Sequence, residues 1–128
     1  LNLTTSYAYD ADNNLIRVTD ANGNVTQYVY DQANEKIFTI DPTGAVTQHG
    51  YDADGHLTTT RGYATVLTAS QLSALGNDPT IAAVSADLTP GGSDSYQQSV
   101  YDADGQVVYA IDGLGLNVTQ YTYNAGGQ

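Results

Sequence analysis

Acidic and amide side chains are the groups of this chain best suited to bind a metal ion. They stand at alternate positions in two places, Asp10, Asp12 and Asn14, and again Asp20, Asn22 and Asn24. Alternate oxygen ligands are typical of calcium-binding loops. No bidentate Glu follows at the distance that such a loop requires, so the sequence favours turn capping as the role of these carboxylates. We therefore expect no metal and no cofactor, with a calcium-stabilised repeat as the alternative.

Two histidines, His49 and His56, are the other candidates for acid-base chemistry. Neither they nor hydroxyl residues such as Ser99 stand in a pattern that indicates a Ser-His-Asp triad. His49 takes the position that Tyr28 holds one repeat earlier, and His56 follows a turn, so a structural role is favoured for both. We assign no catalytic residue and expect the chain not to be an enzyme.

Tyrosine dominates the aromatic residues, with 11 copies against one Phe and no Trp. A row of exposed tyrosines could stack on sugar rings, which makes a carbohydrate- or cell-surface-binding module an alternative function. Its candidate residues are Tyr28, Tyr30, Tyr51, Tyr121 and Tyr123. Cross-strand packing of these rings inside a sheet is the favoured interpretation.

The tyrosines also mark an internal repeat. Tyr9, Tyr30 and Tyr51 are 21 residues apart, and the pattern resumes at Tyr101 and starts again at Tyr123. Each complete unit opens with Tyr-Asp and has Asn or Gly four residues after the tyrosine, a position that we expect to need a positive φ. The predicted turn residues are Tyr9, Asp10 and Asn13; Tyr30, Asp31 and Asn34; Tyr51, Asp52 and Gly55; and Tyr101, Asp102 and Gly105.

A second turn follows about ten residues later in the units, where an Asp precedes a Gly by three positions. This spacing is typical of a type I turn, and it falls at Gly23, Gly44 and Gly115. Strand-like runs lie between the turns, at residues 15–19, 25–30, 37–40, 46–51, 107–111 and 118–123. The sequence therefore predicts a mainly β fold, in which antiparallel β-hairpin repeats form a continuous curved sheet.

One segment departs from the repeat and predicts a short helical insertion. We place the repeats at residues 1–62 and 100–128 and the insertion at 63–99, between two units, with the third unit losing its second strand. Thr68 and Gln71 fit a capping box and Gly76 fits a helix stop. Asp78 followed by a proline fits the start of a second helix.

The charge of the chain limits its partners. The formal net charge is −11, with 14 acidic residues against three basic ones, so a phosphate backbone would be repelled and we expect no nucleic-acid partner. No apolar run approaches the roughly 20 residues of a membrane span. The first residues show no signal peptide, so we expect any export signal to lie outside this sequence.

The units YDADNNLIRVTDANGNVTQYVYD, YDADGHLTTTRGY and YDADGQVVYAIDGLGLNVTQYTYN resemble the YD repeats of bacterial Rhs proteins, insecticidal-toxin C components and animal teneurins. This resemblance implies a long sheet that spirals into a hollow shell, which in the toxins encloses a C-terminal effector. It also implies a secreted or cell-surface location and a bacterial source. The expected partners are neighbouring repeats of the parent chain and an enclosed effector domain, with self-association through exposed sheet edges.

Overall fold

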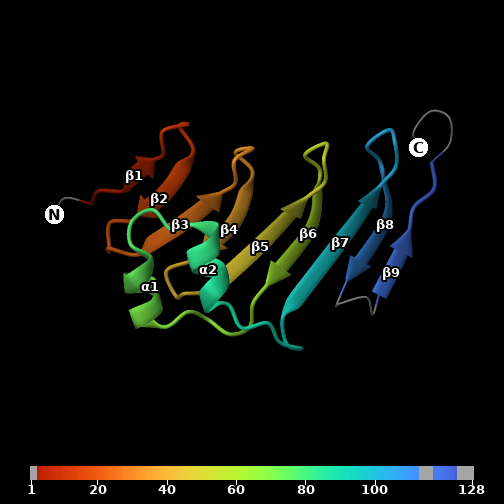
Figure 1. Cartoon of the computed structure of the whole chain (residues 1–128). Coiled ribbons are helices and arrows are strands. Elements are labelled where there is room, and N and C mark those ends of the chain that lie inside the picture. Colours follow the sequence, from red (N-terminus) through yellow and green to blue (C-terminus); the bar gives the residue numbers. More distant parts are fainter. Residues whose placement is uncertain (1–2, 113–116, 124–128) are drawn as a thin grey trace.

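The computed structural model describes residues 3–112 and 117–123, and these residues form one open antiparallel sheet with two short helices (Figure 1). Each strand pairs with its neighbours in sequence, in the order β1 to β9. The strands are β1 Ser6–Tyr9, β2 Leu15–Thr19, β3 Val25–Tyr30, β4 Lys36–Ile40, β5 Val46–Tyr51, β6 Leu57–Gly62, β7 Ser95–Tyr101, β8 Val107–Asp112 and β9 Asn117–Gln120. The predicted fold class is confirmed.

The strands form where apolar and polar residues alternate, since successive side chains point to opposite faces of a sheet. In β3, Gln27 and Val29 are buried on one face, whereas Tyr28 and Tyr30 are half-buried on the other. The run expected at residues 118–123 gives a shorter strand, since β9 ends at Gln120. The turn expected at Gly115 lies outside the described residues.

The insertion contains α1 (Ala69–Leu75) and α2 (Ile81–Asp87). The capping box predicted at Thr68 is present, and Gly76 ends α1 as predicted. The predicted start of α2 was wrong by two residues: its N-cap is Thr80, whose hydroxyl accepts a hydrogen bond from the Ala83 amide at 3.1 Å. A hydroxyl placed next to the first helical turn satisfies a free N–H there, so Pro79 lies before the cap rather than inside the helix.

The insertion connects β6 to β7, and these two strands pair with each other antiparallel. The prediction that the third unit loses its second strand was therefore wrong, because β7 is that strand. It begins at Ser95, inside the stretch that the sequence assigned to the insertion. The first residues of β7 are mostly polar and follow Gly91 and Gly92. The alternation of apolar residues that predicts a strand is therefore absent there.

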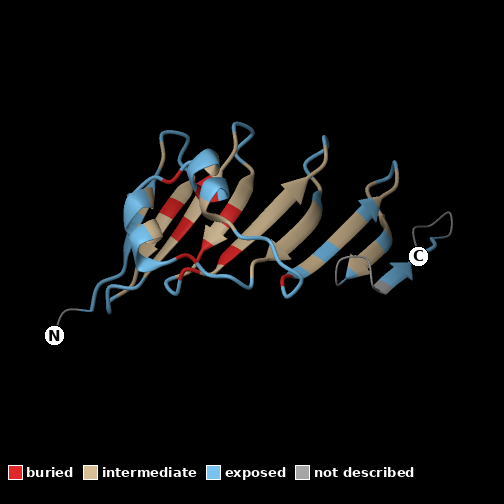
Figure 2. Ribbon diagram, turned by 60° about the horizontal axis from the view of Figure 1, so that its bottom comes forward, coloured by how far each residue is buried: buried red, intermediate tan, exposed pale blue. Residues whose placement is uncertain are grey.

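The two helices lie across one face of the sheet over β3, β4 and β5, and the buried residues gather beneath them (Figure 2). This core consists of Val29, Phe38, Ile40, Val46, Leu67 and Val84. Backbone bonds fix the insertion to the sheet, from the Leu67 amide to the Gly44 carbonyl at 2.8 Å and from Tyr63 to Val46 at 3.0 Å. Neither helix is long and apolar enough to cross a membrane, within the described residues.

Candidate functional site

The aspartate that begins each predicted turn bonds to the backbone of that turn. In each unit one carboxylate oxygen accepts hydrogen bonds from the amides two and four residues later; for Asp10 these bonds are 3.0 and 2.8 Å long. The same two bonds recur at Asp20, Asp31, Asp41, Asp52 and Asp102. Because one side chain bonds to two amides of the turn, the aspartate fixes the local backbone conformation.

The six described aspartate turns share one backbone conformation, at both edges of the sheet. The residue three positions after the aspartate has a positive φ, which is 69° at Asn13, 63° at Asn34 and between 77° and 91° at Gly23, Gly44, Gly55 and Gly105. Its amide donates to the aspartate carbonyl, and the aspartate amide donates to the carbonyl four residues on. The sequence predicts two kinds of turn, but in both kinds the residue with a positive φ stands three positions after the aspartate.

These hydrogen bonds shift the acidity of the carboxylates. At Asp10 and Asp52, the backbone amide four residues later is the main reason that the pKa lies below its ordinary value. The side chain of Asn24 is the main cause of the lowered pKa of Asp20. At Asp41 burial opposes the shift, but bonds from Thr43 and the turn amides together still lower the pKa. The turns therefore hold charged carboxylates.

A β-bulge follows each Tyr-Asp turn. Val29 faces Phe38 and Tyr30 faces Lys36, so Ile37 is an extra residue on β4. The register shifts in the same way next to Tyr9, Tyr51 and Tyr101. A bulge bends its strand, increases the local twist and interrupts the ladder of backbone hydrogen bonds.

The repeated tyrosine hydroxyls join one unit to the next across this bulge. The Tyr30 hydroxyl donates to the Leu15 carbonyl at 3.0 Å, and Leu15 is the residue that faces Tyr9. Tyr51 donates to Lys36 in the same manner at 2.9 Å. Two further bonds run from Tyr101 to Leu57 and from Tyr123 to Val107. We call this row of hydroxyl bonds the tyrosine ladder.

The turns themselves also touch from unit to unit. The Asn14 side chain donates to the Asn34 side chain at 2.9 Å. One unit further along the sheet, the His56 ring stacks on the Tyr101 ring with 4.7 Å between centroids. Burial and the nearby Asp31 raise the pKa of Glu35, which stands at the matching position between them. Neighbouring turns therefore contact each other between the first and second units and between the third and fourth.

Most of the tyrosines that the sequence offers as ligand contacts instead contact other residues of the sheet. Tyr30 and Tyr51 are half-buried members of the tyrosine ladder, and burial raises the pKa of both hydroxyls. The Lys36 ammonium lies over the Tyr28 ring, 4.4 Å from its centroid. Tyr121 and Tyr123 are more open, with 44% and 37% of their surface exposed.

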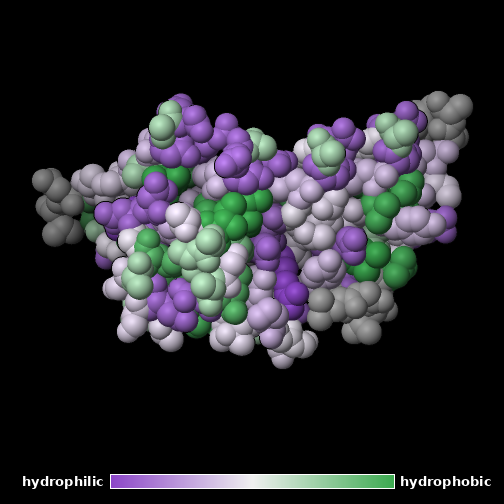
Figure 3. Space-filling view, in the orientation of Figure 1, coloured by the Kyte–Doolittle hydropathy of each residue, from purple (hydrophilic) through white to green (hydrophobic). Residues whose placement is uncertain are grey.

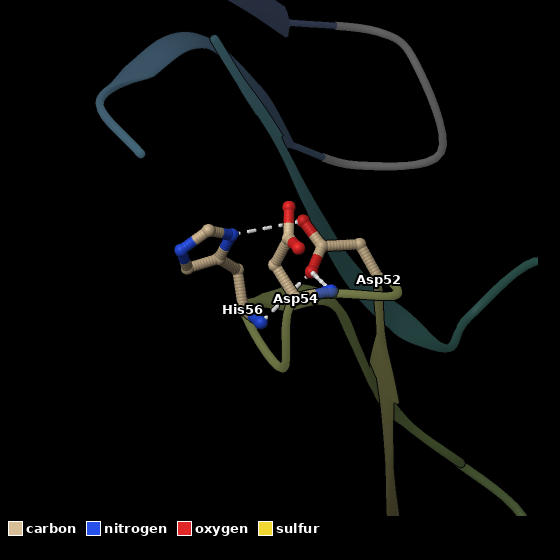
Figure 4. A group of neighbouring side chains, drawn as sticks. All are labelled: Asp52, Asp54 and His56. Atoms are coloured by element: carbon tan, nitrogen blue, oxygen red, sulfur yellow. Dashed lines mark hydrogen bonds and ion pairs between the residues drawn. The ribbon is translucent and has the colours of Figure 1, made fainter. Parts of the chain in front are cut away.

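Asp52, Asp54 and His56 form the one described group of three whose ligand atoms lie close enough to hold a metal ion, within 4.8 Å of one another (Figure 4). The His56 ring nitrogen Nδ1 lies 3.0 Å from the second carboxylate oxygen of Asp52. The other oxygen of Asp52 already accepts two backbone bonds, at 2.9 Å each. The bonds within the turn therefore account for both oxygens of Asp52 and for His56 Nδ1.

The other histidine, His49, lies in β5 opposite Thr60. Burial and the neighbouring Lys36 lower its pKa, so the ring is neutral near pH 7. It has no carboxylate within ion-pair distance among the described residues.

The fold and its turns define a class of protein, an antiparallel β-hairpin repeat whose units are joined by bulges and by the tyrosine ladder. A protein-family model described as RHS Repeat matches residues 2–35. The matched segment covers the first unit and the turn that opens the second, so this part of the chain is similar to the RHS repeat. A search of curated proteins gave no match.

Sequence reasoning missed two parts of this arrangement. The sequence predicts a packing or ligand-binding role for the repeated tyrosine, but it does not predict the hydrogen bond from its hydroxyl to the preceding unit. The ion pair between Arg61 and the buried Asp94, at 2.9 Å, was also missed. Asp94 further accepts bonds from the Ala64 and Gly91 amides, which together with Arg61 lower its pKa and fasten both ends of the insertion.

Proposed function

We propose that this chain is part of a structural scaffold, in which RHS repeats build a β-sheet shell around an effector domain of the parent protein. The observation that carries the proposal is the uniform junction between units. Each hairpin contains the same bulge and the same Tyr-Asp turn, and its tyrosine hydroxyl bonds to the previous hairpin, even where the insertion separates the two in sequence. A bond that recurs at each of these junctions lets a sheet grow by adding units, because each unit buries its surface against the next.

The sheet edges support neighbouring repeats as the partners. Among the described residues, β1 and β9 each pair with a single strand, which leaves one row of backbone donors and acceptors on each. A further repeat satisfies such an edge, and a second copy of the chain does so in its absence. The parent protein is then secreted or displayed at a bacterial cell surface, and this segment itself performs no catalysis.

Limited proteolysis of the intact parent protein tests the container role. The surviving fragments are mapped by mass before and after the shell is denatured. Protection of a fragment beyond the repeats until the shell unfolds is the expected result. Free removal of everything outside the repeats, with the repeats alone resisting, would overturn encapsulation and favour a surface spacer.

A binding module for carbohydrate is the second candidate. One cleft of about 630 Å³ is lined by Tyr28 and Tyr30 together with the carboxylates Asp10, Asp12, Asp31 and Asp78. Aromatic faces beside carboxylate acceptors are suited to sugar hydroxyls and rings. Replacing Tyr28 by Ala distinguishes the roles, since a binding platform loses glycan retention on an array and keeps its melting temperature, whereas a packing residue loses stability.

A further inference from the structure

The face of the sheet that carries the helices has a second apolar patch, which no described residue covers. We call Val100, Tyr109, Ile111 and Val118 the β7–β9 patch. Val100, Tyr109 and Val118 are 38%, 39% and 60% exposed, whereas the core residues beneath the helices are at most 3% exposed. Figure 3 shows hydrophobic residues over β7 to β9, apart from those beside the helices.

This patch repeats the covered one in register. The sheet half of the core rests on the pairs Val29–Phe38, Gln27–Ile40 and Ile40–Val46. The same three pairs recur as Val100–Tyr109, Gln98–Ile111 and Ile111–Val118. Side chains on neighbouring strands that face each other form the units of packing on a sheet. The β7–β9 patch therefore presents the surface on which α1 and α2 pack in the second unit.

The patch is not a feature of every unit. Arg17 and Thr19 take the positions of Phe38 and Ile40 in the first unit, and Thr59 and Arg61 take them in the third. A polar surface at those positions needs no cover, so the face alternates between polar and apolar units. An apolar surface that is left uncovered in the fourth unit therefore indicates a specific contact rather than a requirement of the repeat.

Polar groups at the rim of the patch also match. In the covered patch, Gln27 donates to the Gly76 carbonyl at the end of α1 at 2.8 Å, and Gln48 accepts from the Tyr63 hydroxyl. Gln98 and Gln120 hold the equivalent positions on β7 and β9. They provide an amide that can serve the free carbonyls at a helix end.

Charge restricts the chemistry of the partner. Between Ser95 and Tyr123 the chain has no Lys or Arg, while Asp102, Asp104 and Asp112 flank the patch. We propose that the β7–β9 patch is a docking surface for an amphipathic helical segment whose apolar face is flanked by basic residues. The docking surface does not depend on whether the repeats close into a shell.

Two synthetic peptides serve as probes, both labelled with a fluorophore at the N-terminus. One has the sequence of residues 63–94, which the chain itself uses to cover the equivalent patch. The other has the same sequence with Asp78→Lys and Asp87→Lys. Fluorescence anisotropy with the full chain is expected to show binding of the basic peptide, tighter at low than at high ionic strength and tighter than that of the first peptide.

Adjacent substitutions on β9 separate this surface from the rest of the chain. Val118 faces Ile111 on the helix-bearing side, whereas Thr119 faces Ala110 on the opposite side. Both are exposed, so both variants should fold with the circular dichroism and melting temperature of the parent chain. Val118→Asp is expected to weaken the binding of the basic peptide by about tenfold or more. Thr119→Asp is expected to leave the affinity for this peptide unchanged.

Three results would overturn the proposal. The basic peptide does not bind at concentrations up to about 1 mM; or the two β9 variants bind it equally; or the chain forms a dimer in sedimentation experiments that Val118→Asp alone abolishes. The last result would make a second copy the occupant of the patch. Binding that is lost only in Val118→Asp supports a helical partner.

Discussion

The tyrosine that opens each repeat acts through its hydroxyl as well as its ring. Its ring packs within the sheet, and its hydroxyl satisfies a carbonyl in the preceding unit, next to the bulge. A carbonyl freed from the backbone ladder needs such a partner when it is partly buried. The Tyr-Asp pair thus joins two functions, since the tyrosine holds units together and the aspartate shapes the turn.

Replacing Tyr51 by Phe tests the tyrosine ladder at a single residue. The substitution keeps the ring and removes the hydrogen bond to Lys36, so the free energy of unfolding should fall by about 1 kcal/mol. Urea denaturation followed by circular dichroism measures the change. Tyr121→Phe, at a ring that is 44% exposed, is the control and should have little effect. An equal loss in both variants would argue against the ladder.

Among the elements of the fold, the turns are alike, but one of them contacts the insertion. Gly23 and Gly44 hold the same position in successive turns, with φ of 84° and 91°. A methyl group added at Gly23 would meet nothing within 4 Å, whereas one at Gly44 would lie 2.4 Å from the Leu67 carbonyl oxygen. That oxygen belongs to the segment that enters α1.

We therefore expect Gly44→Ala to destabilise the chain far more than Gly23→Ala. The shared cost of a left-handed alanine is about 1–2 kcal/mol, and Gly44→Ala adds a clash with backbone that is held by the bond from Leu67 to Gly44. Thermal melts of the two variants compare them directly. If their melting temperatures fall equally, the insertion is not fixed at this turn.

The aspartate turns also predict loss of stability in acid. The carboxyl pKa values of Asp10, Asp20, Asp41 and Asp52 are lower in the folded chain than their ordinary value of 3.8. Their contribution is therefore complete above pH 3.8 and is lost as the pH falls through the lower folded values. Urea midpoints measured from pH 6 downwards should decline below about pH 4.

Protonation also relaxes the general repulsion among the acidic residues, which acts in the opposite direction. Asp20→Asn isolates the contribution of one turn, because an amide oxygen can still accept from the Asn22 and Asn24 amides. This variant should lose less stability than the parent chain between pH 5 and pH 2. A parallel decline in both would show that the turn carboxylate is not responsible.

At the scale of the whole molecule, the sheet has little core of its own. The buried apolar residues of the described chain lie mainly under the insertion, whereas the described residues of β6 to β9 are half-buried or exposed (Figure 2). Because a two-layer arrangement is needed to bury one face of a sheet, the insertion stabilises the units that it covers. It lies over β3 to β5 although it connects β6 to β7.

Calcium tests whether the acidic turns depend on an ion. One oxygen of each turn aspartate already accepts two backbone bonds, and Asp10 and Asp20 accept a third from an Asn side chain. We expect millimolar calcium to leave the melting temperature unchanged, with magnesium as the control for ionic strength. A rise with calcium alone would support the calcium-stabilised alternative, since a ligand that binds only the folded state raises its stability.

The local structure of the turns and of the helix start could be predicted from the sequence. The period of the tyrosines, the positive φ at Asn34 and Gly55, and the capping box at Thr68 depend on residues close together in the chain. Glycine and asparagine tolerate left-handed backbone, and a side-chain oxygen near a helix start finds the same amides in any context. Those parts of the turns and of the sheet could therefore be predicted.

Only the tertiary structure decided what lies on the two faces. The tyrosine hydroxyls bond carbonyls 15 or more residues away, and β7 is recognised by its pairing with β6 rather than by its composition. Phe38 and Ile40 hold the same repeat positions as Tyr109 and Ile111. The helices cover the first pair and leave the second pair uncovered. Which of two matching surfaces is buried depends on how the insertion crosses the sheet, and that path is set by long-range packing.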